Sequence, residues 1–124
     1  MAMKILVVDD SSIMRKMVGR ALQLTGLPIE RIGEANDGFG ALDELRAKPY
    51  DLVMMDLNMP NLDGLGLTKA IRANATHRYT PILLLTTESD PARKAEGKAA
   101  GATGWLVKPF QPEQLLATIR KVLA

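Results

Sequence analysis

Short apolar runs alternate with stretches of helical spacing along the whole chain. The clearest runs cover residues 5–8, 52–55 and 81–85, and Thr86 directly follows the last of them. Unbroken apolar runs of this length are typical of strands that are covered on both faces of a sheet. Weaker runs at residues 31–35 and 104–107 bring the number of predicted strands to five.

The segments between these strands predict helices. After the first strand, apolar residues recur at helical spacing, which predicts a helix that Asp10 or Ser11 caps and that buries Met14 and Met17 in the core. The fourth helix has the weakest pattern, because Gly97 in its interior costs about 1 kcal/mol relative to Ala. Strands that alternate with helices predict an α/β, doubly wound fold with a mostly parallel sheet.

Polar side chains follow four of the five predicted strands. Asp9 and Asp10 follow the first strand, while Asp56, Thr86 and Lys108 follow the third, fourth and fifth. Because ligands of such folds bind beyond the carboxyl ends of the strands, we expect these side chains to share one edge of the sheet.

Three carboxylates at one edge repel one another and call for a cation. A hard cation with oxygen ligands fits best, and we expect Mg²⁺ with Mn²⁺ as a substitute. Lys108 and Thr86 would supply donors for phosphoryl oxygens, so the set predicts phosphoryl transfer to a carboxylate.

Composition and charge further restrict the classes of protein that fit the sequence. The chain has 124 residues, of which 47% are apolar, which suits a single domain over residues 1–124. A net charge of +2 gives no indication of a nucleic-acid surface, and the lack of cysteine excludes disulfides and thiolate metal sites. No apolar stretch approaches the roughly 20 residues that span a bilayer. We therefore expect a protein that does not insert into a membrane and that is located in the cytoplasm.

Four sequence blocks resemble the signature of response-regulator receiver domains, and the resemblance extends over the chain from Lys4 to Leu123. The blocks are Val7-Val8-Asp9-Asp10, Asp56-Leu57-Asn58-Met59-Pro60-Asn61-Leu62-Asp63-Gly64, Leu85-Thr86 and Lys108-Pro109-Phe110. The resemblance implies a flavodoxin-like (βα)5 three-layer sandwich with parallel sheet order 2-1-3-4-5. It also implies a phosphorylation-dependent signalling switch of a two-component system, which is a phosphoacceptor and not an enzyme.

The same resemblance assigns roles at the edge of the sheet. Asp56 would be the phosphoacceptor, and Asp10, Asp56 and the backbone carbonyl of Asn58 would ligate Mg²⁺. Asp9 would act largely through metal-bound water. Lys108 would pair with the phosphoryl group, and its peptide bond to Pro109 would be cis.

Two further pairs of residues follow from the resemblance. Thr86 and Trp105 would form the switch, with the threonine moving inward and the aromatic ring responding. Asn58 and Glu88 would tune dephosphorylation, and this pair resembles that of chemotaxis receivers, which suggests a phosphoryl lifetime nearer seconds to minutes than hours.

The resemblance also indicates partners. A histidine kinase or phosphotransfer protein would dock over the first helix near Ser11, Met14 and Arg15. A downstream protein would bind the face of the fourth helix, fifth strand and fifth helix, which includes Ser89, Lys94, Trp105, Val107 and Gln111. We expect a monomer that contacts no nucleic acid directly, with chemotaxis as the leading pathway.

Other classes fit the sequence less well. A haloacid-dehalogenase-like phosphatase needs a second acid where Asn58 stands, and a nucleotide-binding protein needs a glycine-rich loop after the first strand. A receiver fragment of a larger regulator and a constitutive docking module both stay open. His77, the only histidine, has no partner in the sequence pattern and is expected to be exposed.

Overall fold

A computed structural model describes residues 2–87 and 91–124 of the chain. In chain order the elements are β1 (Met3–Val8), α1 (Ser12–Leu24), β2 (Ile29–Ala35), α2 (Gly38–Ala47), β3 (Leu52–Asp56), α3 (Gly64–Ala73), the 3-10 turn η1 (Ala75–His77), β4 (Ile82–Thr86), α4 (Pro91–Ala100), β5 (Gly104–Val107) and α5 (Pro112–Leu123). Each predicted strand and helix is present.

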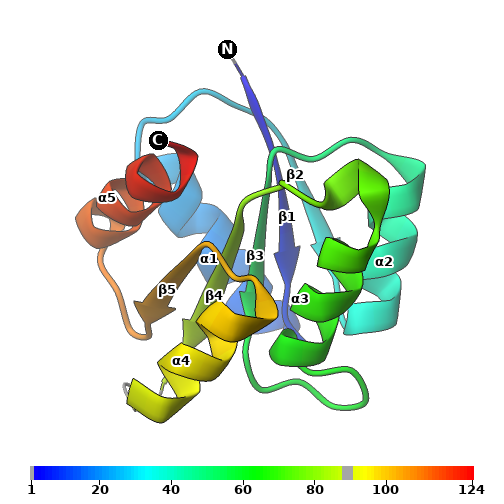
Figure 1. Ribbon diagram of the computed structural model, residues 1–124. Helices are drawn as coiled ribbons and strands as arrows, with labels where there is room; N and C mark the ends of the chain where they lie inside the picture. The colour runs from blue at the N-terminus through cyan, green and yellow to red at the C-terminus, as the bar shows by residue number, and fades with distance from the viewer. Residues whose placement is uncertain (1, 88–90) are drawn as a thin grey trace.

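The five strands form one parallel sheet in the order β2-β1-β3-β4-β5. Helices α1 and α5 cover one face of this sheet, and α2, α3 and α4 cover the other (Figure 1). The predicted doubly wound, three-layer architecture and its strand order are therefore confirmed.

The central strand β3 shows why its sequence is an unbroken apolar run. Leu52 and Met54 pack into the layer with α1 and α5, whereas Val53 and Met55 pack into the opposite layer. All four side chains are fully buried. Successive residues of a strand point to opposite faces, so a strand buried on both faces needs apolar residues at every position.

Helix α1 is capped by Ser11, whose hydroxyl accepts a hydrogen bond from the Met14 backbone N–H at 3.2 Å. The face that it buries is narrower than its apolar stripe. Val18 and Leu22 are buried, but Met17 is 59% exposed, so the prediction that Met17 packs in the core is wrong. The apolar stripe therefore extends beyond the buried face of α1 onto a flank that is largely exposed.

Gly97 is buried on α4, where its lack of a side chain serves the packing of the helix. A Cβ atom there would lie 2.8 Å from Leu84 Cδ1 and 3.3 Å from Trp105 Cζ3. The lack of a side chain therefore lets α4 approach β4 and the indole ring closely. This packing offsets the helix propensity that glycine lacks.

His77 is buried, with 6% of its surface exposed, so the prediction of an exposed histidine is wrong. Its Nε2 lies 2.9 Å from the Leu45 carbonyl oxygen, and its Nδ1 lies 3.2 Å from Thr80 Oγ1. Because a carbonyl only accepts, Nε2 carries the proton. The ring thus ties the C-terminal end of α2 to the connection between α3 and β4, two segments that are distant in sequence.

We predict that His77→Ala lowers the free energy of unfolding by about 1–3 kcal/mol, because it leaves the buried Leu45 carbonyl without its donor. The matched control is Arg78→Ala, since Arg78 is the exposed neighbouring residue. That variant should change the free energy of unfolding by less than about 0.5 kcal/mol. Urea unfolding followed by circular dichroism measures both values, and equal midpoints for the two variants would contradict the assignment.

Candidate functional site

The predicted site residues meet at the carboxyl edge of the sheet. Asp56 is the last residue of β3, and Thr86 is the last residue of β4. The register pairs Asp56 with Leu85 and Thr86 with Val107, so neighbouring strands end almost level. Lys108 directly follows β5, and its backbone N–H donates to the Thr86 carbonyl at 2.7 Å.

Three carboxylates form a cluster at this edge. Oxygen atoms of Asp9, Asp10 and Asp56 lie within 4.8 Å of one another. Asp9 and Asp56 are 3% and 9% exposed, whereas Asp10 is open to solvent. The cluster thus has a buried part and an exposed part through which a ligand can enter.

Lys108 lies beside the two buried carboxylates. Its Nζ is 3.4 Å from Asp56 Oδ1 and 3.9 Å from Asp9 Oδ2, and only 13% of its side chain is exposed. One ammonium cannot balance three carboxylates. The acids therefore fit a divalent cation with oxygen ligands, since Mg²⁺ binds through one or two carboxylates together with waters and phosphate oxygens.

Burial raises the pKa of the Asp9 carboxyl above its ordinary value of 3.8, and the nearby Asp56 charge raises it further. A hydrogen bond from the Ser11 backbone N–H to Asp9 Oδ1, at 2.9 Å, and the charge of Lys108 oppose this rise in pKa without cancelling it. The ionised carboxylate is consequently destabilising in the absence of a cation.

The loop between β3 and α3 carries Asn58 past the Asp56 carboxylate. The Asn58 backbone N–H lies 3.5 Å from Asp56 Oδ1. Gly64 closes the loop by donating to the Leu57 carbonyl at 2.9 Å. A Cβ atom at Gly64 would lie 2.8 Å from the Leu57 Cα, so the close approach of α3 to the end of β3 requires glycine.

The remaining predicted residues lie around this cluster. Thr86 is fully buried, and Trp105 is half-buried, with its indole Nε1 enclosed and without a hydrogen-bond partner in the described part of the chain. The peptide bond between Lys108 and Pro109 is cis, as predicted. Glu88, the second predicted tuning residue, lies outside the described residues, as does Ser89 of the predicted target face.

Arg15, predicted only as part of the kinase-docking surface, also contacts the site. Its side chain is 17% exposed and turns toward the sheet, where Nη1 donates to the Asp9 carbonyl at 2.7 Å. Its Nε donates to Glu34 at 2.8 Å. This contact could not be predicted from local sequence, because Glu34 is on β2 and comes close to Arg15 only when β2 pairs with β1.

Within the described residues, no helix is both long and apolar enough to cross a membrane.

The fold and the edge cluster together define a class of protein, a doubly wound α/β domain with a cluster of carboxylates and a lysine at the carboxyl ends of its strands. Comparison with known proteins identifies the family within this class. Residues 5–120 match the family model described as the response regulator receiver domain, and the chain belongs to this family.

Individual relatives agree with this assignment. The chain is 38% identical to the chemotaxis protein CheY-3 of Vibrio cholerae over 120 residues, covering 97% of this chain and 91% of the relative. It is 37% identical to the chemotaxis protein CheY of Pseudomonas aeruginosa, covering 97% and 95% of the two chains. The solved structure of the chemotaxis response regulator CheY4 of Vibrio cholerae is 46% identical, with a TM-score of 0.89 and coverage of 99% and 100%.

Membership of the family has consequences for function. Receiver domains are signalling switches controlled by phosphorylation, they bind Mg²⁺ at an acidic pocket, and they interact with histidine kinases and downstream targets. Among residues 2–87 and 91–124, the cluster of Asp9, Asp10 and Asp56 is the acidic group that could hold such an ion.

We predict that Asp9→Asn stabilises the protein at pH 7 in buffer free of divalent cations, by about 0.5–2 kcal/mol in the free energy of unfolding, because it removes a buried charge. The pKa of Asp9 is higher in the folded than in the unfolded chain. The folded chain therefore binds the Asp9 proton more tightly, and the contribution of Asp9 to wild-type stability falls as the pH rises from 3.8 through the raised pKa. The advantage of Asn should accordingly be full above that pKa and disappear below pH 3.8.

Thermal unfolding at a series of pH values measures this difference. The exposed Asp43, whose side chain is 76% exposed, supplies the matched control Asp43→Asn. This control should change stability by less than about 0.5 kcal/mol. An Asp9→Asn protein that is less stable than wild type at pH 7 would contradict the prediction.

Proposed function

We propose that this chain is the phosphoacceptor switch of a two-component system and that Asp56 accepts the phosphoryl group from a histidine kinase, a phosphotransfer protein or a small phosphodonor. The observation that supports this most directly is the position of the Asp56 carboxylate. It ends the central strand, lies 3.4 Å from the Lys108 ammonium and belongs to the carboxylate cluster. Residues 1–124 act as one receiver domain.

In the proposed step, a carboxylate oxygen of Asp56 forms a bond to phosphorus. The bond from phosphorus to the histidine nitrogen of the donor breaks, and that nitrogen keeps the electron pair and takes a proton from solvent. Lys108 and Thr86 donate hydrogen bonds to the phosphoryl oxygens. The chain assists its own phosphorylation and dephosphorylation, and it has no other substrate.

Divalent metal has a defined place in this proposal. Asp10, Asp56 and the backbone carbonyl of Asn58 would hold Mg²⁺ or Mn²⁺, with Asp9 acting through metal-bound water. The cation would neutralise negative charge on the phosphoryl group and the carboxylates. Charge neutralisation is what the acids need, since Lys108 is the one cation that pairs with both buried carboxylates in the described part of the chain.

The signal would pass from Thr86 to Trp105 across the β4–β5 pair. Thr86 pairs with Val107 and Leu84 pairs with Trp105, so the two switch residues lie on adjacent strands. A shift of Thr86 toward the phosphoryl group would change the space beside the indole. Because Gly97 of α4 lies against the same ring, movement of the ring would also reach α4.

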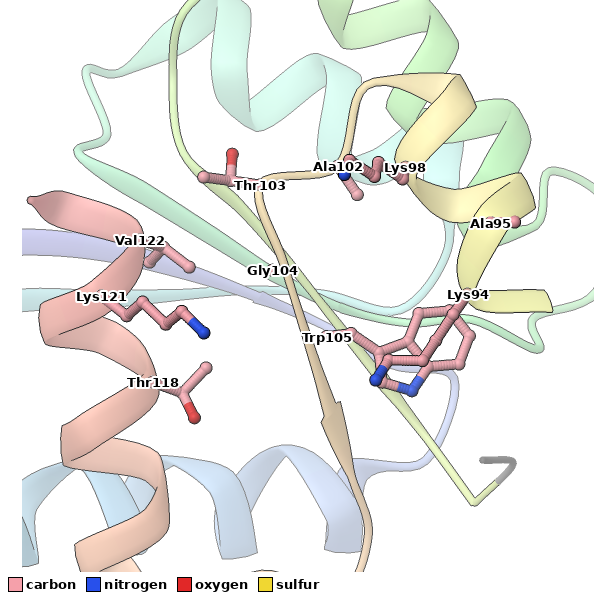
Figure 2. A pocket seen from close by; sticks show the side chains of 10 residues that line it. All are labelled: Lys94, Ala95, Lys98, Ala102, Thr103, Gly104, Trp105, Thr118, Lys121 and Val122. Atoms are coloured by element: carbon pink, nitrogen blue, oxygen red, sulfur yellow. The ribbon is translucent and has the colours of Figure 1, made fainter. Parts of the chain in front are cut away.

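The proposed target face contains a cavity of about 460 Å³ between α4, β5 and α5 (Figure 2). It is lined by Lys94, Ala95, Lys98, Ala102, Thr103, Gly104, Trp105, Thr118, Lys121 and Val122. The exposed residues Val107 and Gln111 belong to the same predicted face. A downstream protein bound here would be sensitive to the position of Trp105, and similarity to the CheY proteins favours a chemotaxis pathway.

We also propose that the chain acts in the cytoplasm as a monomer and makes no direct contact with nucleic acid. The rival function is a constitutive docking module that is never phosphorylated, and that function predicts no response to a phosphodonor.

We predict that acetyl phosphate or beryllium fluoride, each added with Mg²⁺, changes the fluorescence of Trp105, the only tryptophan. Acetyl phosphate should also add one phosphoryl group in intact-protein mass spectrometry. Asp56→Asn should abolish both effects because it removes the nucleophile, while the exposed control Asp43→Asn should keep both. Phosphorylation that persists in Asp56→Asn would place the nucleophile elsewhere, and no phosphorylation of the wild type would favour the docking module.

A further inference from the structure

We propose that Arg15 and Glu34 position the acid pair for cation binding, an inference that rests on the proposed metal-dependent function. Neither residue is a candidate ligand or phosphoryl donor. Arg15 is on α1, the helix that follows the turn with Asp9 and Asp10, and Glu34 is on β2, the edge strand that pairs with β1. Their contact therefore connects α1 to the sheet beside this turn.

The guanidinium of Arg15 contacts the peptide that joins the two acids. Nη1 donates at 2.7 Å to the carbonyl oxygen of Asp9. That carbonyl and the backbone N–H of Asp10 belong to one planar peptide unit. Fixing the carbonyl therefore fixes the orientation of this peptide and limits the directions in which the Asp10 side chain can point, although that side chain is exposed.

Asp9 is held at two further points. Its backbone N–H donates to the Ala35 carbonyl at 3.1 Å, and its Oδ1 accepts from the Ser11 backbone N–H at 2.9 Å. With Arg15, these contacts fix the backbone N–H, the backbone carbonyl and the carboxylate of Asp9. The turn is consequently ordered before any cation binds, which lowers the entropy that binding would cost.

The Glu34 carboxylate holds the Arg15 guanidinium in place. It accepts from Arg15 Nε at 2.8 Å, and the register places it opposite Val7, near the end of β1. A planar guanidinium can donate in two directions at once, to the carboxylate through Nε and to the carbonyl through Nη1. Lysine has no such fork and could keep only one of the two contacts.

The sign of the effect on cation affinity separates positioning from charge. Removing a positive charge near a cation site should tighten cation binding if Coulomb interaction alone matters. Removing a residue that orients the ligands should weaken cation binding, and changes that disturb the supporting contacts of metal ligands typically cost 10–100-fold in affinity.

The test is a Mn²⁺ titration without phosphodonor, followed by the electron paramagnetic resonance signal of free Mn²⁺. We expect Arg15→Met to raise the dissociation constant about tenfold. Arg20→Met removes the same charge from an exposed position on α1 and should leave the constant within about twofold or slightly lower. Urea unfolding in cation-free buffer verifies that each variant is folded.

A second pair of variants tests the inference from the other partner and does not depend on the folding of Arg15→Met. Glu34→Gln and Glu34→Ala lose the same charge, but only Gln keeps an oxygen that can accept from Arg15 Nε. We expect Glu34→Ala to bind Mn²⁺ at least threefold more weakly than Glu34→Gln.

The Mn²⁺ titrations distinguish failure of the positioning role from failure of the proposed function. Unchanged or tighter binding by Arg15→Met, or equal binding by the two Glu34 variants, would overturn the positioning role while leaving the proposed function intact. A wild-type protein that does not bind Mn²⁺ would overturn the proposed function itself.

Discussion

Repulsion between the buried carboxylates of Asp9 and Asp56 is the constraint around which this site is built. Both side chains lie at the edge of an otherwise apolar sheet, and Lys108 is the ammonium that contacts both. Burial that raises the pKa of Asp9 also makes the folded protein less stable than it would be with a neutral side chain there. We therefore infer that the site lowers the stability of the free protein and, in return, can bind a cation and a phosphoryl group.

The sheet order explains how these side chains come together. Strands β1 and β3 are neighbours at the centre of the sheet, and β4 and β5 follow on one side. Their carboxyl ends lie almost level, so residues from four distant segments reach one edge. Gly64 and the pair of Arg15 with Glu34 then hold the loops that follow β3 and β1, next to the acids.

Much of this arrangement could be predicted from the sequence because it depends on local pattern. Apolar runs predicted the strands, and polar residues at the ends of those runs predicted the cluster, which the structure confirms as a cluster. Roles such as phosphoacceptor or metal ligand stay predictions. His77, Met17 and Arg15 could not be placed, since their surroundings depend on contacts between segments distant in sequence. Gly97 was correctly placed in a helix, but its role appeared only once the neighbouring Trp105 ring was seen.

The central claim is that the phosphoryl group is received by Asp56 and by neither of the other two acids. It is tested most directly by treating the wild-type protein with acetyl phosphate, trapping the acyl phosphate by borohydride reduction and mapping the modified peptide by tandem mass spectrometry. We predict one reduced residue, Asp56, that appears with Mg²⁺ and disappears when the cation is chelated. Modification at Asp9 or Asp10, or modification of Asp56 that does not depend on a divalent cation, would contradict it.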